Sequence, residues 1–257
     1  TGANLANRSL LYLGVSGDGD SASIGLGQFA HAMRRGVRMA YIVENNGVYG
    51  LTKGQFSATA DQGSKSKKGV VNNDAAVDLV AMALQLGATY VARSFSGDKE
   101  QLVPLIKGAM SHGGAAFIDV ISPCVTFNNH GGSTKSYDYV RQHNEAVSRI
   151  DFISPGSEIT TSYAPGERVE VAQHDGSILR LRKLHAAYDP TDRHAALDHM
   201  HRHAAQGEVV TGLLYIDPLA TDLHCAMNTA AAPLASLGLE TLCPGGKTLD
   251  KINAALR

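Results

Sequence analysis

The sequence has few cysteines, almost no net charge and no long apolar run, and each shortage argues against a class of protein. Its 257 residues include three cysteines, which is too few for a disulfide framework and favours an intracellular, reducing compartment, the cytoplasm. The formal net charge of −1 gives no reason to expect a nucleic-acid or membrane-surface partner. No apolar run approaches the ~20 residues of a transmembrane helix, and the first residues do not read as a signal peptide.

The remaining composition is that of a globular protein. Hydrophobic residues make up 44% and charged residues 18% of the chain, which suits one large domain or a domain with an extension. The sequence opens at Thr1 without a methionine, and its first letters, TGANLAN, read like the end of a helix. We therefore expect an N-terminal portion that precedes this sequence.

Strand and helix patterns alternate along the first half of the chain. The pattern predicts strands at 9–16, 37–43, 88–92 and 115–121, and helices at 21–35, 74–87 and 98–110. Arg34, Arg35 and Gly36 are stop signals for the first of these helices. Such alternation indicates an α/β fold, a doubly wound and mostly parallel sheet with helices on both faces. Ligands of such sheets bind at the carboxyl ends of the strands.

The second half of the chain differs from the first in polarity and in its pattern of strands and helices. After residue 126 the chain becomes polar, then 156–184 reads as strands, with a His-Asp-Gly turn typical of a hairpin. A helix at 191–206, a strand at 208–216 and an extended or helical arm at 221–257 follow. We expect residues 1–150 to form the ligand-binding domain and residues 151–257 to form a C-terminal α+β extension that makes subunit contacts.

Three polar segments permit more than one interpretation. Residues 53–70 lack periodicity, so they form a solvated loop or else a lid or partner-docking loop with clustered lysines. His199 and His203 have the spacing of helical metal ligands, although a solvated helix face explains them more simply. The run from Asn72 to Asp74 is most simply a helix cap.

The most informative pair of residues is Asp18 and Asn46. Each follows an expected strand, and their separation is about that of one strand–helix–strand unit. If the two strands are neighbours, both side chains converge on one crevice. Carboxylate and amide oxygens are ligands that suit Mg²⁺, which fills its other positions with phosphate oxygens and water. Gly17 and Gly19 let the backbone approach a phosphate, so the pattern predicts a diphosphate held through Mg²⁺.

The same segment resembles a known family. GDGD followed by NN is similar to the binding motif for thiamine diphosphate (ThDP), and ENNGVYGLTKGQ resembles the β subunit of 2-oxoacid:ferredoxin oxidoreductases, most closely the 2-oxoglutarate type. SPCVTFNNHGGSTKSYDYVRQHN and LCPGGKTLDKINAALR are similar to later blocks of that family. The resemblance implies oxidative decarboxylation of 2-oxoglutarate to succinyl-CoA and CO₂, with electrons passed through a [4Fe–4S] cluster to ferredoxin. It also implies an α subunit that supplies a Glu to the cofactor, in an α2β2 assembly.

The resemblance assigns roles to individual residues. Asp18, Asn46 and the carbonyl of Val48 would bind Mg²⁺. Lys53 and Leu51 are the expected catalytic residues; from its place just past the cofactor loop, Lys53 would hold the second carboxylate of 2-oxoglutarate, or else it is a surface lysine. The residues that would line the diphosphate are Gly17, Gly19, Asp20, Tyr49, Gly50, Leu51 and Thr52.

The cysteine pattern departs from that of the family. Cys124 matches one ligand of the [4Fe–4S] cluster, but the other cluster cysteines of the family would lie upstream of Thr1. Without the resemblance, Cys124 would be a small buried apolar residue. Two other functions stay open: the same chemistry on pyruvate or branched 2-oxoacids, and a non-catalytic phosphate-binding module.

Overall fold

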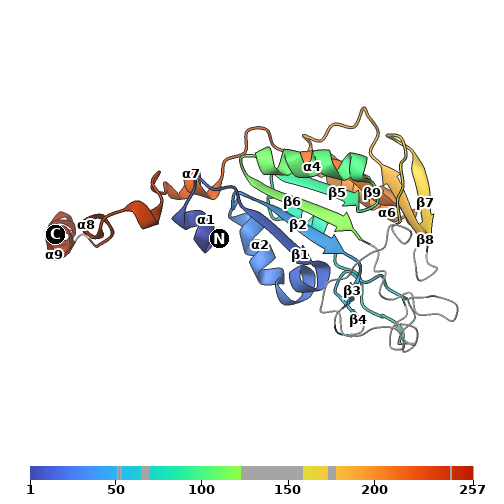
Figure 1. The fold of residues 1–257 in the computed structure, drawn as a ribbon, viewed down its shortest axis with the longest axis horizontal. Helices are drawn as coiled ribbons and strands as arrows, with labels where there is room; N and C mark the ends of the chain where they lie inside the picture. Colours follow the sequence, from blue (N-terminus) through green and yellow to red (C-terminus); the bar gives the residue numbers. More distant parts are fainter. Residues whose placement is uncertain are drawn as a thin grey trace, which may run out of the picture.

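The structure of the chain is a computed structural model. It describes residues 1–50, 52, 54–64, 70–122, 159–172, 178–243 and 245–256. Figure 1 shows a twisted sheet with helices on either side and a C-terminal arm that runs away from the sheet.

A seven-stranded sheet forms the centre of the molecule, in the order β1-β2-β6-β5-β9-β8-β7. Strands β1, β2, β6 and β5 are parallel to one another, β9 runs antiparallel to β5, and β8 is parallel to β9 and antiparallel to β7. This arrangement confirms the expected mostly parallel sheet. The strands are β1 Leu13–Gly17, β2 Met39–Asn45, β5 Tyr90–Phe95, β6 Ala115–Ile121, β7 Arg168–Ala172, β8 Ile178–Lys183 and β9 Val209–Ile216.

Helices cover both faces of this sheet, as expected for a doubly wound fold. The helices are α2 Leu26–Arg34, α3 Leu79–Gln85, α4 Lys99–Ser111 and α6 Arg193–Ala204. One buried cluster joins α2, α3 and α6 to the face that carries Val43, Val91 and Phe117. A second cluster joins α4 to the opposite face, which carries Ile42, Ala92 and Ile118. Adjacent residues of one strand thus enter different cores, as the pleat of a strand requires.

The C-terminal end of α2 follows local sequence signals. At its C-terminus, Gly36 has φ +64, its N–H donates to the Met33 carbonyl, and the N–H of Val37 donates to the Ala32 carbonyl. These paired bonds form a Schellman motif, which requires the left-handed conformation that glycine adopts easily. The start of the expected helix 21–35 differs, because residues Gly19–Ile24 form a π-helical segment ahead of α2.

The prediction that Asn72 to Asp74 caps a helix is wrong. Helix α3 begins at Leu79, and its N-cap is Asp78, whose carboxylate accepts hydrogen bonds from the N–H groups of Val80 and Ala81. Asn72 is buried instead and donates to the carbonyls of Ala60 and Asp61, so it holds a loop together.

The two expected parts of the chain share one sheet, because β9 of the second part pairs with β5 of the first. The boundary between 1–150 and 151–257 falls outside the described residues, so this division stays a prediction. The hairpin expected within 156–184 is present as β7 and β8, and its turn also lies outside the described residues.

In Figure 1 the short helix α1 Gly2–Ala6 lies beside α7 Leu223–Met227 at one end of the sheet, and the C-terminus lies at the far tip of the arm. Beyond α7, the chain continues through Leu234–Ser236, α8 Leu239–Leu242 and α9 Gly246–Ala255, which confirms a helical arm. Within the described residues, no helix has the length and apolar character needed to cross a bilayer.

Candidate cofactor-binding site

The candidate site lies where β1 and β2 end. The two strands are parallel neighbours, with Gly17 opposite Glu44. Asp18 therefore follows β1 at the same edge of the sheet where Asn45 ends β2. The backbone N–H of Gly47, the residue after Asn46, donates to Asp18 Oδ2 over 3.1 Å. The structure thus brings Asp18 and the Asn46 turn together, as the sequence spacing predicts.

Asp18 is a buried carboxylate, only 1% exposed. Its Oδ2 accepts hydrogen bonds from the N–H of Gly47 and from the hydroxyls of Ser57 and Thr59. Among the described residues these three donors are neutral, all reach the same oxygen, and Asp18 has no ion-pair partner. A buried carboxylate is stable when a positive charge balances it, so this donor set fits a bound cation with Oδ1 as its ligand.

Asn46 and Val48 lie in the turn that follows β2. The side chain of Asn46 is exposed, and its Oδ1 accepts a hydrogen bond from the N–H of Val48 over 3.1 Å. An amide oxygen has two lone pairs, so this bond leaves capacity for a cation. Val48 and Tyr49 form β3, which pairs with β4 Gln55–Phe56 in a small antiparallel hairpin beside the sheet.

Tyr49 packs directly on the glycine-rich turn. Its hydroxyl donates to the carbonyl of Gly19 over 3.0 Å. A Cβ added to Gly19 would lie 2.3 Å from the Tyr49 ring, so no larger residue fits there without displacing the tyrosine. This contact joins the turn after β1 to the hairpin after β2, and both segments carry residues expected to line a diphosphate.

The other expected site residues have different environments. Gly17 ends β1 with Asp20 Oδ2 near it, and Asp20 itself is exposed. Gly50 and Thr52 lie in the hairpin loop, where the Thr52 hydroxyl bonds to Gln55. The expected catalytic residues Leu51 and Lys53 and the expected cluster ligand Cys124 lie outside the described residues. The roles of all these residues stay predictions.

Sequence reasoning missed Ser57 and Thr59, whose hydroxyls contact Asp18. Both belong to the stretch that was interpreted as a solvated loop or a lid. In the structure, residues 54–64 return to the site, and the N–H of Ser57 donates to the carbonyl of Gly47. Ser57 is buried. The lysines at 65, 67 and 68 lie outside the described residues, so the two interpretations of that part stay open.

Sequence reasoning also missed a network of connected polar side chains next to the site. Asn45 donates through Nδ2 to Asp119 Oδ1 over 3.0 Å, and Arg93 forms ion pairs with Asp119 at 2.8 Å and Asp78 at 2.7 Å. Burial disfavours the charged form of Arg93, but the carboxylates of Asp78 and Asp119 outweigh it and raise the pKa of the guanidinium. Burial raises the pKa of Asp119, and the ion pair with Arg93 opposes that shift.

The histidines of α6 contact other residues. His203 Nδ1 is 2.8 Å from Glu208 Oε2, and the His199 ring contacts those of Tyr188 and His203. The described part of the chain contains no group of three or more His, Cys, Asp or Glu side chains that could hold a metal ion.

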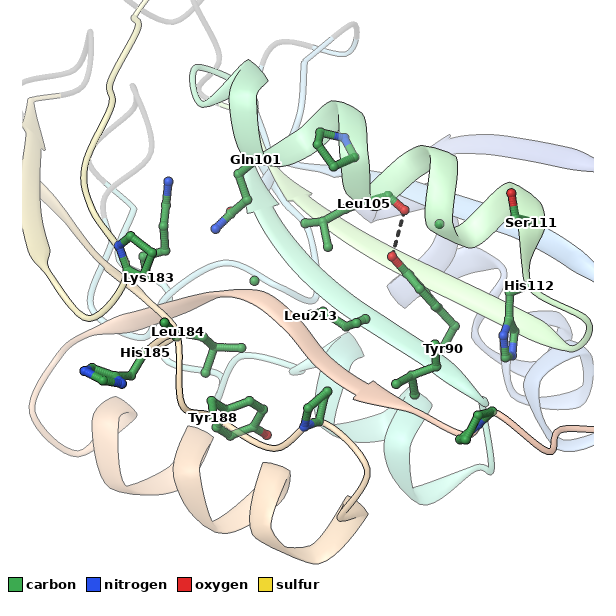
Figure 2. A pocket seen from close by; sticks show the side chains of 18 of the residues that line it. Tyr90, Gln101, Leu105, Ser111, His112, Lys183, Leu184, His185, Tyr188 and Leu213 are labelled. Carbon is green, nitrogen blue, oxygen red and sulfur yellow. Dashed lines mark hydrogen bonds between the residues drawn. The ribbon is translucent and has the colours of Figure 1, made fainter.

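A hollow lies elsewhere on the molecule, between α4 and β9. It has a volume of about 860 Å³, and Tyr90, Leu105, His112, Lys183, Tyr188 and Leu213 are among its lining residues (Figure 2). The hydroxyl of Tyr90 donates to the Leu105 carbonyl at its wall. None of the residues around Asp18 line this hollow, so it is separate from the candidate site.

Comparison with known proteins shows which families the chain is similar to. Residues 1–120 match the family model of the C-terminal TPP-binding domain of thiamine pyrophosphate enzymes, and thiamine pyrophosphate is ThDP. The chain is 47% identical over 131 residues to a 2-oxoacid:ferredoxin oxidoreductase β subunit of Saccharolobus solfataricus, covering 50% of this chain and 42% of the relative. It is 34% identical over 160 residues to the 2-oxoglutarate oxidoreductase subunit KorB of Mycobacterium tuberculosis, covering 62% and 41%.

The fold of this chain is also similar to that of a solved structure. The fold is similar to that of the 2-oxoglutarate:ferredoxin oxidoreductase from Magnetococcus marinus with 2-oxoglutarate, coenzyme A and succinyl-CoA bound, at a TM-score of 0.62 and 28% identity. That match covers 88% of this chain and 64% of the other. The sequence matches span less than half of the two curated relatives. Residues 1–120 are therefore similar to ThDP-binding domains, and the chain is similar to the β subunits of 2-oxoacid:ferredoxin oxidoreductases, the family that its motifs resemble.

Proposed function

We propose that this chain is the ThDP-binding subunit of a 2-oxoglutarate:ferredoxin oxidoreductase, which converts 2-oxoglutarate to succinyl-CoA and CO₂. The observation that carries the proposal is the buried carboxylate of Asp18, hydrogen-bonded to the turn of Asn46 and Gly47 in a domain that matches ThDP-binding domains. Bound ThDP would supply the carbon nucleophile for decarboxylation of a 2-oxoacid. The contribution of the chain is to bind and orient that cofactor.

Each part of the site has a distinct task in this proposal. Asp18 Oδ1, Asn46 Oδ1 and the Val48 carbonyl would hold Mg²⁺, which would bind the diphosphate of the cofactor. The turn from Gly17 to Asp20 and the hairpin from Tyr49 to Thr52 line the diphosphate. The contact of Tyr49 with Gly19 keeps these two walls together, so the bound diphosphate is fixed in orientation.

In this proposal, electrons and the succinyl group pass to partner molecules. We assign Cys124 as one thiolate of a [4Fe–4S] cluster, with ferredoxin as the acceptor of its electrons. Coenzyme A takes up the succinyl group. The α subunit contributes the Glu that activates the cofactor, so the chain acts within an α2β2 enzyme. A brown protein with about four irons per β chain would support the cluster.

The choice of 2-oxoglutarate rests on the named relatives and on Lys53. KorB relatives and the Magnetococcus marinus enzyme are named for 2-oxoglutarate. An ammonium at Lys53 would be a point charge for the second carboxylate of this substrate. Pyruvate and branched 2-oxoacids lack that second carboxylate, so discrimination between them depends on this position.

The decisive experiment is replacement of the proposed cation ligand. Asp18→Ala should abolish Mg²⁺-dependent binding of ThDP by the full-length protein, measured by isothermal titration calorimetry. Asp61→Ala is a matched control, because Asp61 is an exposed carboxylate in the nearby loop, and it should bind as the unmodified protein does. Unchanged ThDP binding in Asp18→Ala would contradict the enzyme assignment and favour a phosphate-binding module.

A further inference from the structure

A continuous chain of hydrogen bonds leads from Asp18 to the start of α3. Thr59 Oγ1 lies 2.5 Å from Asp18 Oδ2 and 3.0 Å from Asn45 Oδ1. The bonds from Asn45 to Asp119, from Asp119 to Arg93 and from Arg93 to Asp78 continue it across the sheet. Asp78 in turn accepts the first N–H groups of α3, so a helix terminus anchors the far end.

The register of the strands produces this alignment. Arg93 of β5 lies directly opposite Asp119 of β6, and Val43 of β2 is the partner of Asp119 on its other side. Asn45 is two residues beyond Val43, so its side chain leaves the same face of the sheet and reaches Asp119. These polar groups therefore occupy adjacent positions on one face, next to the apolar core.

Charge fixes the orientation of the Asn45 amide. A carboxylate accepts hydrogen bonds and, in an ion pair with Arg93, has no proton to donate. The NH₂ group of Asn45 must therefore face Asp119, and its Oδ1 must face Thr59. In the reversed orientation two oxygens would meet at hydrogen-bonding distance at Asp119, which is unfavourable in a buried place.

The hydroxyl of Thr59 has one proton and two acceptors, Asp18 Oδ2 and Asn45 Oδ1. The hydroxyl donates to one of them at a time, so Asn45 and Asp18 compete for the same proton and are coupled through Thr59. Ser57 Oγ also lies within hydrogen-bond distance of Asp18 Oδ2 and Thr59 Oγ1, which limits movement of the carboxylate further. With Oδ2 held in this way, the direction of Oδ1 is set by the protein.

We propose that Arg93 and Asp119 are positioning residues for the cation site, acting through Asn45 and Thr59 on the carboxylate of Asp18. This inference rests on the proposed function, because it presumes that Asp18 binds Mg²⁺ beside ThDP. Neither Arg93 nor Asp119 contacts the cofactor in this proposal. Replacing a residue that hydrogen-bonds to metal ligands without touching the metal typically weakens metal binding by about 10–100-fold.

The test is a double-mutant cycle on Mg²⁺ affinity. Asp119 accepts from Asn45 through Oδ1 and from Arg93 through Oδ2. An asparagine has only one side-chain oxygen, so Asp119→Asn cannot keep both bonds. Thr59→Val removes the hydroxyl at nearly constant volume. The dissociation constant of Mg²⁺ is measured on the full-length protein at saturating ThDP, together with the urea unfolding curve of each variant. We expect each single variant to bind Mg²⁺ about 10-fold or more weakly, and the double variant to bind no more weakly than Thr59→Val.

A control variant separates positioning from general damage. Ser94 is the fully buried neighbour of Arg93, and its hydroxyl bonds to Gln101 of α4 on the other face of the sheet. Ser94→Ala should change stability without changing Mg²⁺ affinity more than about twofold. If Asp119→Asn does not fold, Asn45→Ala cuts the chain of bonds at its middle and leaves the Arg93–Asp119 pair intact.

The possible outcomes distinguish the two proposals. Additive effects in the double variant, or unchanged Mg²⁺ affinity in Asp119→Asn and Asn45→Ala, would overturn the positioning role while leaving the ThDP site intact. Absence of Mg²⁺-dependent ThDP binding in the unmodified protein would overturn the proposed function itself.

Discussion

The N–H of Gly47 donates to Oδ2 of Asp18, although the two residues follow different strands. The bond depends on the backbone of Gly47, which has φ +75, a conformation that side chains with a Cβ rarely adopt. The turn that carries Asn46 is therefore held against Asp18 by a glycine in the left-handed region.

Replacement of Gly47 by alanine should weaken both folding and cofactor binding. The left-handed conformation costs a residue with a Cβ about 1–2 kcal/mol, so the free energy of unfolding should fall by about that amount. Mg²⁺-dependent ThDP affinity should fall as well, because the N–H to Asp18 moves. Gly63→Ala is the matched control: Gly63 has φ +85 and open space where a Cβ would lie, so it should lose stability and keep its affinity. Equal affinities in both variants would contradict this role.

Gly19→Ala should prevent the tyrosine contact. The new Cβ would overlap the ring of Tyr49, so the ring and the β3–β4 hairpin must shift, and ThDP affinity should fall by about tenfold or more. Gly27, inside α2, has open space where a Cβ would lie, so Gly27→Ala should stabilise the protein by about 0.5–1 kcal/mol and leave ThDP binding unchanged. Thermal unfolding and calorimetry on both variants distinguish the two effects; retained ThDP affinity in Gly19→Ala would count against the diphosphate wall.

Glu208 should make stability depend on pH in the acid range. The pKa of the buried Glu208 is lowered from 4.5 to about 2. The hydrogen bonds from Arg182 make the largest contribution, and the bond with His203 makes a smaller one. Because the folded protein holds the ionised form, the stabilisation is fully present above pH 4.5 and is lost as the pH falls toward 2. Glu208→Gln should therefore be less stable than the unmodified protein by about 1.5–3 kcal/mol at pH 7.

The difference in stability should narrow steadily below pH 4.5, as followed by urea unfolding. Glu170→Gln is the comparison, because Glu170 pairs with Arg180 at 2.9 Å on the surface and should matter little at any pH. A stability difference for Glu208→Gln that stays constant from neutral to acid pH would show that its carboxylate is not the titrating group.

Lys53 lies outside the described residues, and its assignment yields a prediction about substrates. Lys53→Ala should raise the Michaelis constant for 2-oxoglutarate by about tenfold or more and that for 2-oxobutyrate by much less, because only the former has a second carboxylate. Lys107, an exposed lysine of α4, provides the control variant. Steady-state rates of the assembled enzyme measure both constants, and equal changes for the two substrates would refute a role in recognition.

Part of the site could be predicted because it depends on local sequence. Asp18 and Asn46 follow successive strands, and neighbouring parallel strands end at the same edge, so the spacing alone predicts their approach. Ser57 and Thr59 could not be found in this way. They lie beyond a hairpin, in a stretch without periodicity, and their return to Asp18 is decided by tertiary contacts. A signal for Asp119 did exist, since a lone carboxylate in the apolar strand AAFIDVI needs a buried partner.

The helix boundaries show the same limit. Asp74 and Asp78 are both good N-cap residues, and the sequence alone does not rank them. Asp78 is the cap in the structure, where its carboxylate also pairs with Arg93 from β5. That partner comes from a distant strand, so the choice between the two aspartates becomes visible only when the sheet is assembled.

The antiparallel pairing of β9 with β5 has a consequence for synthesis. Strand β5 is complete at Phe95, but the partner for its open edge begins only at Val209. At roughly 5–20 residues per second, a ribosome needs on the order of ten seconds to make the intervening chain. For that time the nascent protein presents to its surroundings the unpaired edge of the strand YVARSF, which is buried in the folded protein. Expression at reduced translation rate should lengthen this exposure, so the yield of folded protein depends on how quickly residues 209–216 emerge.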